Sequence, residues 1–240
     1  MEHIPFRLPL PLQHLALAAA CGLGAMAVMP AAAQVAPHAA EVAAYKGLHA
    51  AAHKGDVAEI EKIIAPTADL NARDGNGRTP LHVATFARQR NAIRALAKAG
   101  ANIDLLDKDR YDGVTIASVA DDEETLRVLL SLGASPKQVT SRYDGTALIA
   151  AAHLGNDGVV KQLIAAGAPL DHVNNLHWTA AIEAVVLGDG GPRHQATLKA
   201  LIDAGAKLQL ADRQGNTPLQ LARARGYTAM VQMLEKAGAR

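Results

Sequence analysis

The stretch Leu187–Leu198, with the sequence LGDGGPRHQATL, holds side chains whose types and spacing could perform chemistry. Asp189 and His194 are a carboxylate and an imidazole in one short loop, and such a pair could transfer a proton to or from a substrate. Three closely spaced glycines are similar to a phosphate-binding loop, but the form GxGxxG requires glycine where Arg193 stands. No strand is predicted before the loop, and no nucleophile accompanies the pair. A solvated loop is therefore favoured, and a metal-dependent hydrolase seated at residues 188–194 is the less favoured alternative.

Two histidines offer a second possible site. His49 and His53 are four residues apart, which places both imidazoles on one face of a helix, as a metal site would need. No third ligand is evident nearby, so a structural role is favoured for both. The motifs GxxxxGK[ST], HExxH, GxSxG and CxxC do not occur. The sequence therefore predicts no catalytic residue, no cofactor and no metal.

Composition narrows the class of protein further. The chain has 240 residues, and its 24 Lys and Arg nearly balance its 23 Asp and Glu. A nucleic-acid-binding surface would need clustered positive charge, so no nucleic-acid partner is expected. The hydrophobic fraction of 50% is too high for a disordered chain, and the aromatic fraction is only 3%. Scarce aromatics and abundant alanine suit packed helices whose backbones approach closely.

Residues 1–33 have the pattern of a secretory signal peptide. The run Leu15–Met29 carries no charge, and Ala31 and Ala33 occupy the positions of a small-x-small cleavage site. Cleavage after Ala33 would give a periplasmic or secreted protein with no membrane contact. The run is short for a membrane span of about 20 residues, and a retained anchor is the alternative. The absence of a twin-arginine pair favours the general secretion route.

The only cysteine, Cys21, lies inside this uncharged run. Lipidation at Cys21 is an alternative to simple cleavage. If the signal peptide is removed, no cysteine remains to form a disulfide or a thiolate metal site. Packing alone must then hold the exported chain together.

Two sequence markers recur roughly every 33 residues. The first marker opens six segments, which begin at Lys46, Thr79, Thr115, Thr146, Thr179 and Thr217. The second is a segment such as GANID from Gly100 or GAPLD from Gly167. The two markers lie 21 residues apart in four units, 18 apart in the third and 26 apart in the fifth.

Each unit has the layout of two short helices joined by a turn. An Ala-rich helix starts at the threonine, which caps it, and proline at the first helical position loses no hydrogen bond there. A second helix has a Leu, Ile and Val face and ends at a glycine that suits a helix terminus. A polar loop leads to the next threonine. One unit cannot bury its apolar face alone, so the units must stack.

These segments resemble the ankyrin repeat. GRTPLHVA at 77–84 and GNTPLQLA at 215–222 match the T-P-L-H signature of that family, and the resemblance covers about residues 45–240. It implies an all-α-dominated solenoid of six ankyrin repeats with short β-hairpin loops, called fingers, beside the first helices. We expect a linker or cap at 34–44 and repeats at about 45–77, 78–112, 113–144, 145–177, 178–215 and 216–240. In the family the histidine of the signature, here His49 and His82, bonds backbone between repeats.

The fingers are the candidate binding surface. Two of them carry the tetrapeptide RYDG, at 110–113 and 142–145, and the next carries NNLHW, ending at Trp178. Exposed Tyr, Trp and Arg are frequent anchors of protein interfaces. The candidates are Arg110, Tyr111, Arg142, Tyr143, His177, Trp178 and Arg213. The alternative is that these side chains only brace neighbouring fingers, and both roles could hold together.

The stretch at 187–198 fits the repeat as an insertion. It falls between the two helices of the fifth unit, and aligning Gly155 with Gly188 gives it five extra residues. We expect it at the edge opposite the fingers, with Arg193 and His194 starting the next helix. Asp189, Arg193 and His194 form a second candidate contact surface.

The sequence thus predicts a monomeric, exported, non-catalytic scaffold for a protein partner. The chain is similar to small secreted bacterial ankyrin proteins, which implies a partner such as a stress-defence enzyme. An effector secreted onward to a host cell is the alternative.

Overall fold

The structure is a computed structural model, and it describes residues 35–64 and 68–240. Over those residues it contains thirteen α-helices and no strand. The predicted signal peptide at 1–33 lies outside the described residues. A short helix, α1 (Ala39–Ala44), falls in the segment expected to form a cap.

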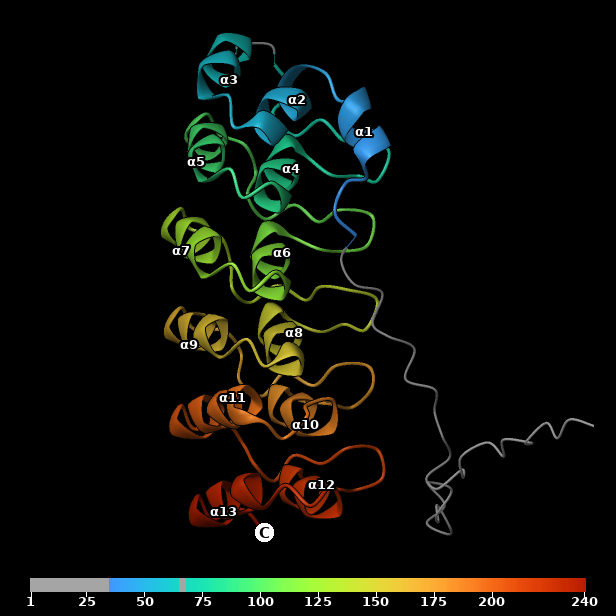
Figure 1. Cartoon of the computed structure of the whole chain (residues 1–240), viewed down its shortest axis with the longest axis vertical. Helices are drawn as coiled ribbons and strands as arrows, with labels where there is room; N and C mark the ends of the chain where they lie inside the picture. Colours follow the sequence, from blue (N-terminus) through green and yellow to red (C-terminus); the bar gives the residue numbers. More distant parts are fainter. Residues whose placement is uncertain (1–34, 65–67) are drawn as a thin grey trace, which may run out of the picture. The chain divides into compact units, whose positions relative to one another are not determined.

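Six antiparallel helix pairs follow α1. They are α2 (Gly47–Lys54) with α3 (Val57–Ile63), α4 (Pro80–Phe86) with α5 (Arg90–Lys98), α6 (Gly113–Val119) with α7 (Glu123–Ser131), α8 (Ala147–Leu154) with α9 (Asp157–Ala165), α10 (Ala180–Val186) with α11 (Pro192–Asp203), and α12 (Pro218–Ala224) with α13 (Thr228–Lys236). The first members stack in one column, here called the inner helices, and the second members stack in another, the outer helices (Figure 1). The fingers extend from the inner column along one side. We call the surface where inner helices and fingers meet the inner face.

Side-chain caps start most inner helices. Thr79, Thr146, Thr179 and Thr217 each accept a hydrogen bond from the backbone N–H three residues later, as predicted. Pro80 and Pro218 occupy the first helical position.

The expected start of the third unit was wrong. Asp112, rather than Thr115, caps α6, and its carboxylate accepts from the Thr115 N–H at 2.7 Å. Aspartate is as effective a cap as threonine. Measured from Asp112, the spacing to Gly133 is 21 residues, as in the regular units.

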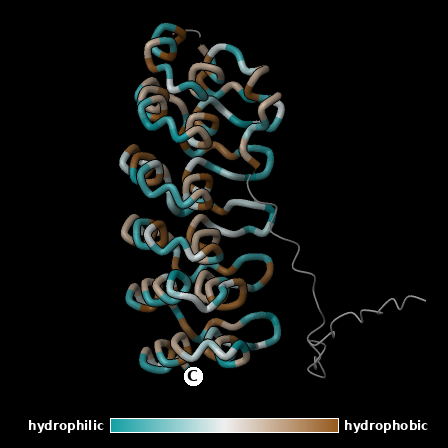
Figure 2. Tube along the Cα trace, viewed as in Figure 1, coloured by the Kyte–Doolittle hydropathy of each residue, from teal (hydrophilic) through white to brown (hydrophobic). Residues whose placement is uncertain are grey.

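The hydrophobic core lies between the two columns. Fully buried alanines such as Ala84, Ala151 and Ala184 line the inner helices, and larger side chains such as Leu126, Leu163 and Leu201 fill the outer ones. Figure 2 shows hydrophobic residues gathered on the helices, whereas much of the finger chain is hydrophilic. On the last helix, Gln232, Glu235 and Lys236 are exposed, as the sequence predicts for the end of a stack. Close packing of small against large side chains thus joins each pair to the next.

The fingers are hydrogen-bonded turns rather than β-hairpins. Across the described residues the only β-type pairing is an isolated bridge between Thr140 and Gly145. The expectation of hairpin strands was therefore wrong, although the loops stand where it placed them.

Candidate protein-binding face

A shared polar turn fixes the shape of four fingers. In each, one side-chain oxygen accepts from the backbone N–H groups two and four residues later, at 2.8 to 3.0 Å. The acceptors are Asp74, Asp107, Asn174 and Asp212. Such turns satisfy backbone donors locally and favour one loop conformation. The residue just before each helix cap is therefore held in a repeated position.

These positions form a row along the inner face, which we call the pre-cap row. Its members are Arg78, Tyr111, Trp178 and Asn216 of these four fingers, together with Gly145, which precedes the cap Thr146 in the remaining finger. Tyr111 and Trp178 are half-buried. Burial raises the pKa of the Tyr111 hydroxyl, so the phenol is neutral at physiological pH. Two amphipathic aromatic side chains are thus presented from fixed backbone positions.

The two RYDG tetrapeptides are not equivalent. Tyr111 directly precedes the cap Asp112, whereas Tyr143 lies three residues before the cap Thr146. Gly145 takes the pre-cap position of that finger. The guanidinium of Arg142 lies 5.5 Å from the centroid of the Tyr143 ring, so these two side chains contact each other at the loop. The structure therefore groups Trp178 with Tyr111 and separates Tyr143 from both.

Neighbouring fingers are joined by backbone hydrogen bonds. The N–H groups of Lys108, Ser141 and Asn175 donate to the carbonyls of Asn76, Arg110 and Tyr143, respectively, at 2.9 to 3.0 Å. Each bond links one finger to the next. The fingers thus form a continuous set rather than independent loops.

Several predicted binding residues also brace the fingers. Arg110 pairs with Asp144 of the next finger at 2.8 Å, and Arg213 donates to the Asn175 carbonyl at 2.5 Å. His177 is exposed and adopts a left-handed backbone conformation, with φ of 63°. Arg110 and Arg213 are engaged within the array, so their role is at least partly structural. Both remain largely exposed and could contact a partner in addition.

Histidines of the inner helices bond the fingers, as predicted. His49 Nε2 lies 3.0 Å from the Arg78 carbonyl, and His82 Nε2 lies 3.0 Å from the Tyr111 carbonyl. The Thr79 N–H donates to His82 Nδ1 at 3.1 Å, so the neutral ring with a proton on Nε2 satisfies both contacts. Burial lowers the pKa of His82 to about 4. His82 therefore fixes the carbonyl of Tyr111 and, with it, part of the pre-cap row.

His53 and His153 occupy equivalent positions of α2 and α8, and both are half-buried. His153 faces Glu183 of α10, with Nδ1 3.4 Å from Oε2. Glu183 is only 4% exposed and accepts from Asn174 Nδ2 at 3.0 Å. Sequence reasoning missed this buried carboxylate. Its signal was an acidic residue in an otherwise apolar helix, AAIEAVV.

The insertion at 187–191 joins α10 to α11, and Arg193 and His194 stand in the first turn of α11, as predicted. The insertion lies among the turns that join the helices of each pair. His194 Nδ1 lies 2.9 Å from Asp189 Oδ1, and His194 Nε2 lies 3.0 Å from the His153 carbonyl. Both ring nitrogens are engaged, so neither is free to act as a general base. The Gly191 N–H and His194 lower the pKa of Asp189.

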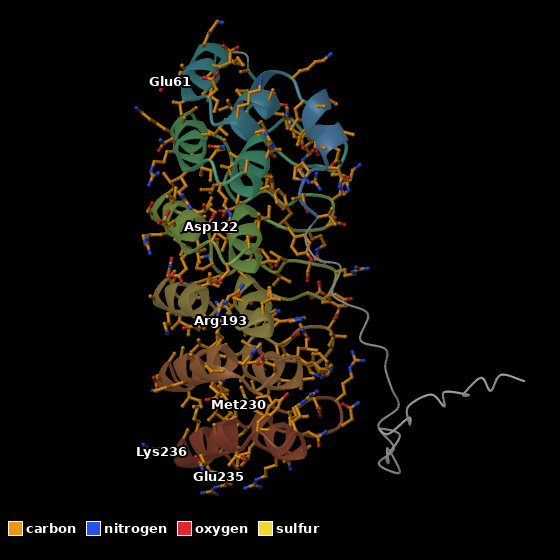
Figure 3. The ribbon with its side chains drawn as sticks, viewed as in Figure 1. Glu61, Asp122, Arg193, Met230, Glu235 and Lys236 are labelled. Carbon is orange, nitrogen blue, oxygen red and sulfur yellow. The ribbon has the colours of Figure 1, made fainter. Side chains whose placement is uncertain are left out.

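Three further contacts tie the insertion and the first turn of α11 to other helix pairs. Arg193 reaches back to Asp121, in the turn of the third pair, at 2.8 Å and to Asp157, the first residue of α9, at 3.6 Å. In Figure 3 Arg193 lies at the level of the α8–α9 pair. Tyr227 of the sixth pair donates through its hydroxyl to the Gly188 carbonyl at 2.9 Å. The insertion thus clamps four successive pairs together.

Neither a cluster of metal ligands nor a membrane-spanning helix occurs in the described part of the chain. Residues 35–64 and 68–240 hold no group of three or more His, Cys, Asp or Glu side chains that could bind a metal ion. Within the same ranges, every helix is too short or too polar to cross a membrane.

Comparison with protein families gives a match along most of the chain. The model described as "Ankyrin repeats (3 copies)" matches residues 15–109, 48–140, 114–212 and 148–240. An ankyrin repeat protein of Escherichia coli K12, YahD, is 35% identical over 190 residues, covering 79% of this chain and 94% of YahD.

Solved structures give the same match. An ankyrin repeat domain from Acinetobacter baumannii AYE superposes with a TM-score of 0.76 at 42% identity, covering 80% of this chain and 98% of that one. At 24% identity, one chain of the complex between the Bdellovibrio bacteriovorus endopeptidase Bd0816 and its immunity protein Bd3460 shares the fold, with a TM-score of 0.66 and coverage of 80% and 98%.

Proposed function

Because the chain belongs to the ankyrin-repeat family, whose arrays serve as protein-binding scaffolds, we propose that it binds a partner protein through Tyr111 and Trp178 of the pre-cap row. The observation that carries this proposal is the fixed, half-buried placement of two aromatic side chains in one register of the inner face. Aromatic anchors on a rigid scaffold lose little conformational entropy on binding. The rest of the finger surface would then supply complementarity around them.

The experiment compares bait proteins in a pull-down. Wild type, the double variant Tyr111→Ala/Trp178→Ala, and the control Tyr143→Ala are immobilised and exposed to extract of the source cells. We expect the double variant to lose the partner that wild type and the control retain. Urea unfolding of each bait separates loss of binding from loss of fold. A folded double variant that retains every partner at wild-type affinity would contradict the proposal.

Scaffolding fits the insertion better than catalysis does. His194 has both ring nitrogens engaged, and Asp189 bonds the Gly191 N–H and His194. A hydrolase at 188–194 would need one of these groups free to act on a substrate. A substrate-dependent activity lost in an Asp189→Asn/His194→Ala variant would argue against the scaffold proposal.

Export is a further part of the proposal. It is supported by the uncharged run Leu15–Met29 and the small residues Ala31 and Ala33. N-terminal sequencing of the protein recovered from the periplasmic fraction should begin at Gln34. Recovery inside a host cell would support the effector alternative instead. The partner class implied by the resemblance is a stress-defence enzyme, and mass spectrometry of the captured protein tests it.

A further inference from the structure

The segment Val35–Glu41, here called the N-terminal strap, lies against the inner face at α4 and α6. In Figure 1 it leads into α1 alongside those two helices. Ala36 shares a cavity of about 180 Å³ with residues of both helices, including Phe86, Ile116 and Val119. Ile116, which lines this cavity with Ala36, is only 1% exposed. The strap thus covers part of the inner face at α4 and α6.

Arg78 of the pre-cap row holds the strap. Its Nη2 donates to the Val35 carbonyl at 2.6 Å, and its Nη1 lies 3.4 Å from Glu41 Oε2. The guanidinium also stands over the Phe86 ring, 5.4 Å from the centroid. Only 5% of the Arg78 side chain is exposed. A buried guanidinium needs such partners, and the strap supplies two of them.

Glu41 gives the strap its second anchor. Its carboxylate accepts from Asn76 Nδ2 in the first finger and from the His38 N–H at 2.6 Å. These contacts combine a backbone carbonyl, a small apolar side chain and a carboxylate, spread over seven residues. The His38 N–H and Arg78 lower the pKa of Glu41, so the carboxylate is charged at neutral pH.

The strap is held far less firmly than the helices beneath it. The side chain of Val35 is among the most exposed large hydrophobic ones, at 49%, and α1 contains no buried residue. Its position depends on Arg78 and on the contacts of Ala36 and Glu41. Because the strap is covalently attached, its effective concentration at the inner face is in the millimolar range. It therefore competes well with a separate partner segment even though its own contacts are few.

We propose that the strap is an intramolecular ligand of the inner face, which a partner displaces with an extended segment carrying a small apolar residue and, a few residues later, a carboxylate. The inference rests on the proposed function and adds the chemistry of the partner. Displacement would free Arg78 and the cavity beside Phe86 for the partner. The array would thus be partly self-occupied until such a segment arrives.

The test uses a fluorescein-labelled peptide of residues 35–43, Val-Ala-Pro-His-Ala-Ala-Glu-Val-Ala, and the full chain. Fluorescence anisotropy gives its Kd for wild type and for Ala36→Glu, which places a bulky charged side chain in a mostly apolar cavity that Asp122 also lines, and so weakens the strap. Ala43→Glu, at an exposed position of α1, is the matched control. We expect the peptide to bind Ala36→Glu at least about tenfold more tightly than wild type or the control. Adding Arg78→Gln should abolish that gain.

A second variant keeps the test decisive if Ala36→Glu fails to fold. Glu41→Gln removes the charge that pairs with Arg78 and should also tighten peptide binding. Equal affinity of the peptide for wild type and every folded strap variant would overturn the proposal, as would a gain that survives Arg78→Gln.

The outcomes separate this inference from the proposed function. If the peptide binds the strap variants no more tightly than wild type, while partner capture still requires Tyr111 and Trp178, only the strap proposal falls. If the peptide gains affinity while capture ignores both aromatics, the proposed binding row falls and the strap proposal stands.

Discussion

Tyr111 and Trp178 occupy equivalent positions, each one residue before the cap of its inner helix, with Gly145 in that position between them. The backbone N–H of each is bonded to the polar side chain four residues earlier, at 2.9 Å. The two rings therefore project from backbone positions set by the same turn. Gly145 places no side chain between them.

Removing one ring should act on dissociation from the partner. We expect Trp178→Ala to raise Kd by about 30-fold, or about 2 kcal/mol, chiefly by raising the dissociation rate. Surface plasmon resonance with the captured partner gives both rate constants. Tyr143→Ala should change Kd by less than about threefold. A change confined to the association rate would contradict an anchoring role.

The buried His82 predicts a loss of stability in mild acid. The pKa of His82 is about 4 in the fold because of burial, against an ordinary value of 6.5. Protonation therefore favours the unfolded chain. The stability contributed by the neutral ring is complete above pH 6.5 and is lost as pH falls toward 4, by up to about 3 kcal/mol.

Urea unfolding at pH 7.5 and 4.5 measures this dependence. His82→Gln should have a lower free energy of unfolding than wild type at pH 7.5. That free energy should also fall less between pH 7.5 and 4.5 than it does in wild type. The difference between the two losses isolates His82 from the carboxylates that titrate in the same range. Equal losses in the two proteins would show that His82 is not the group responsible.

The cap of α6 should tolerate a change to threonine but not to alanine. Asp112→Ala removes the acceptor for the Thr115 N–H and is expected to cost about 1 to 2 kcal/mol. Asp112→Thr keeps a capping oxygen and should cost less than half as much. The free energy of unfolding in urea is the measurement. If both variants lost the same amount, the cap would not be the source of the stability.

Substitution of Gly188 should destabilise the fold because the neighbouring atoms leave no room for a side chain. A Cβ there would overlap the Ala184 carbonyl oxygen and the ring of His194. We expect Gly188→Ala to cost about 2 kcal/mol or more. Gly75→Ala is the control, since a Cβ at Gly75 meets nothing within 4 Å, and it should change stability by less than about 0.5 kcal/mol. Thermal unfolding of both variants checks this, and similar midpoints would contradict the packing described here.

Local markers made the helix pairs predictable, because capping residues and glycine terminators act within a few residues of the helix ends they set. The same locality explains the error at α6. The threonine marker predicts a cap at Thr115, but the cap is Asp112, whose carboxylate accepts from the Thr115 N–H.

The candidate site was less predictable because it depends on register and on distant contacts. Two identical RYDG segments suggested equal roles for Tyr111 and Tyr143, yet Tyr111 stands one residue before its helix cap and Tyr143 stands three residues before its own. The pairing of Arg78 with Val35 joins residues 43 positions apart, and no local pattern indicates it.

The contact between Arg193 and Asp121 joins residues 72 positions apart and skips one whole helix pair. In a regular array, stability is close to a sum of unit terms and nearest-neighbour terms, so units can be added or removed with little penalty elsewhere. A next-nearest-neighbour bond breaks that rule. An extra unit inserted between the third and fifth pairs would separate Arg193 from Asp121. The contact therefore couples the third pair to the fifth by about 1 kcal/mol or less, since both side chains are well exposed, and it favours the present length of this part of the array.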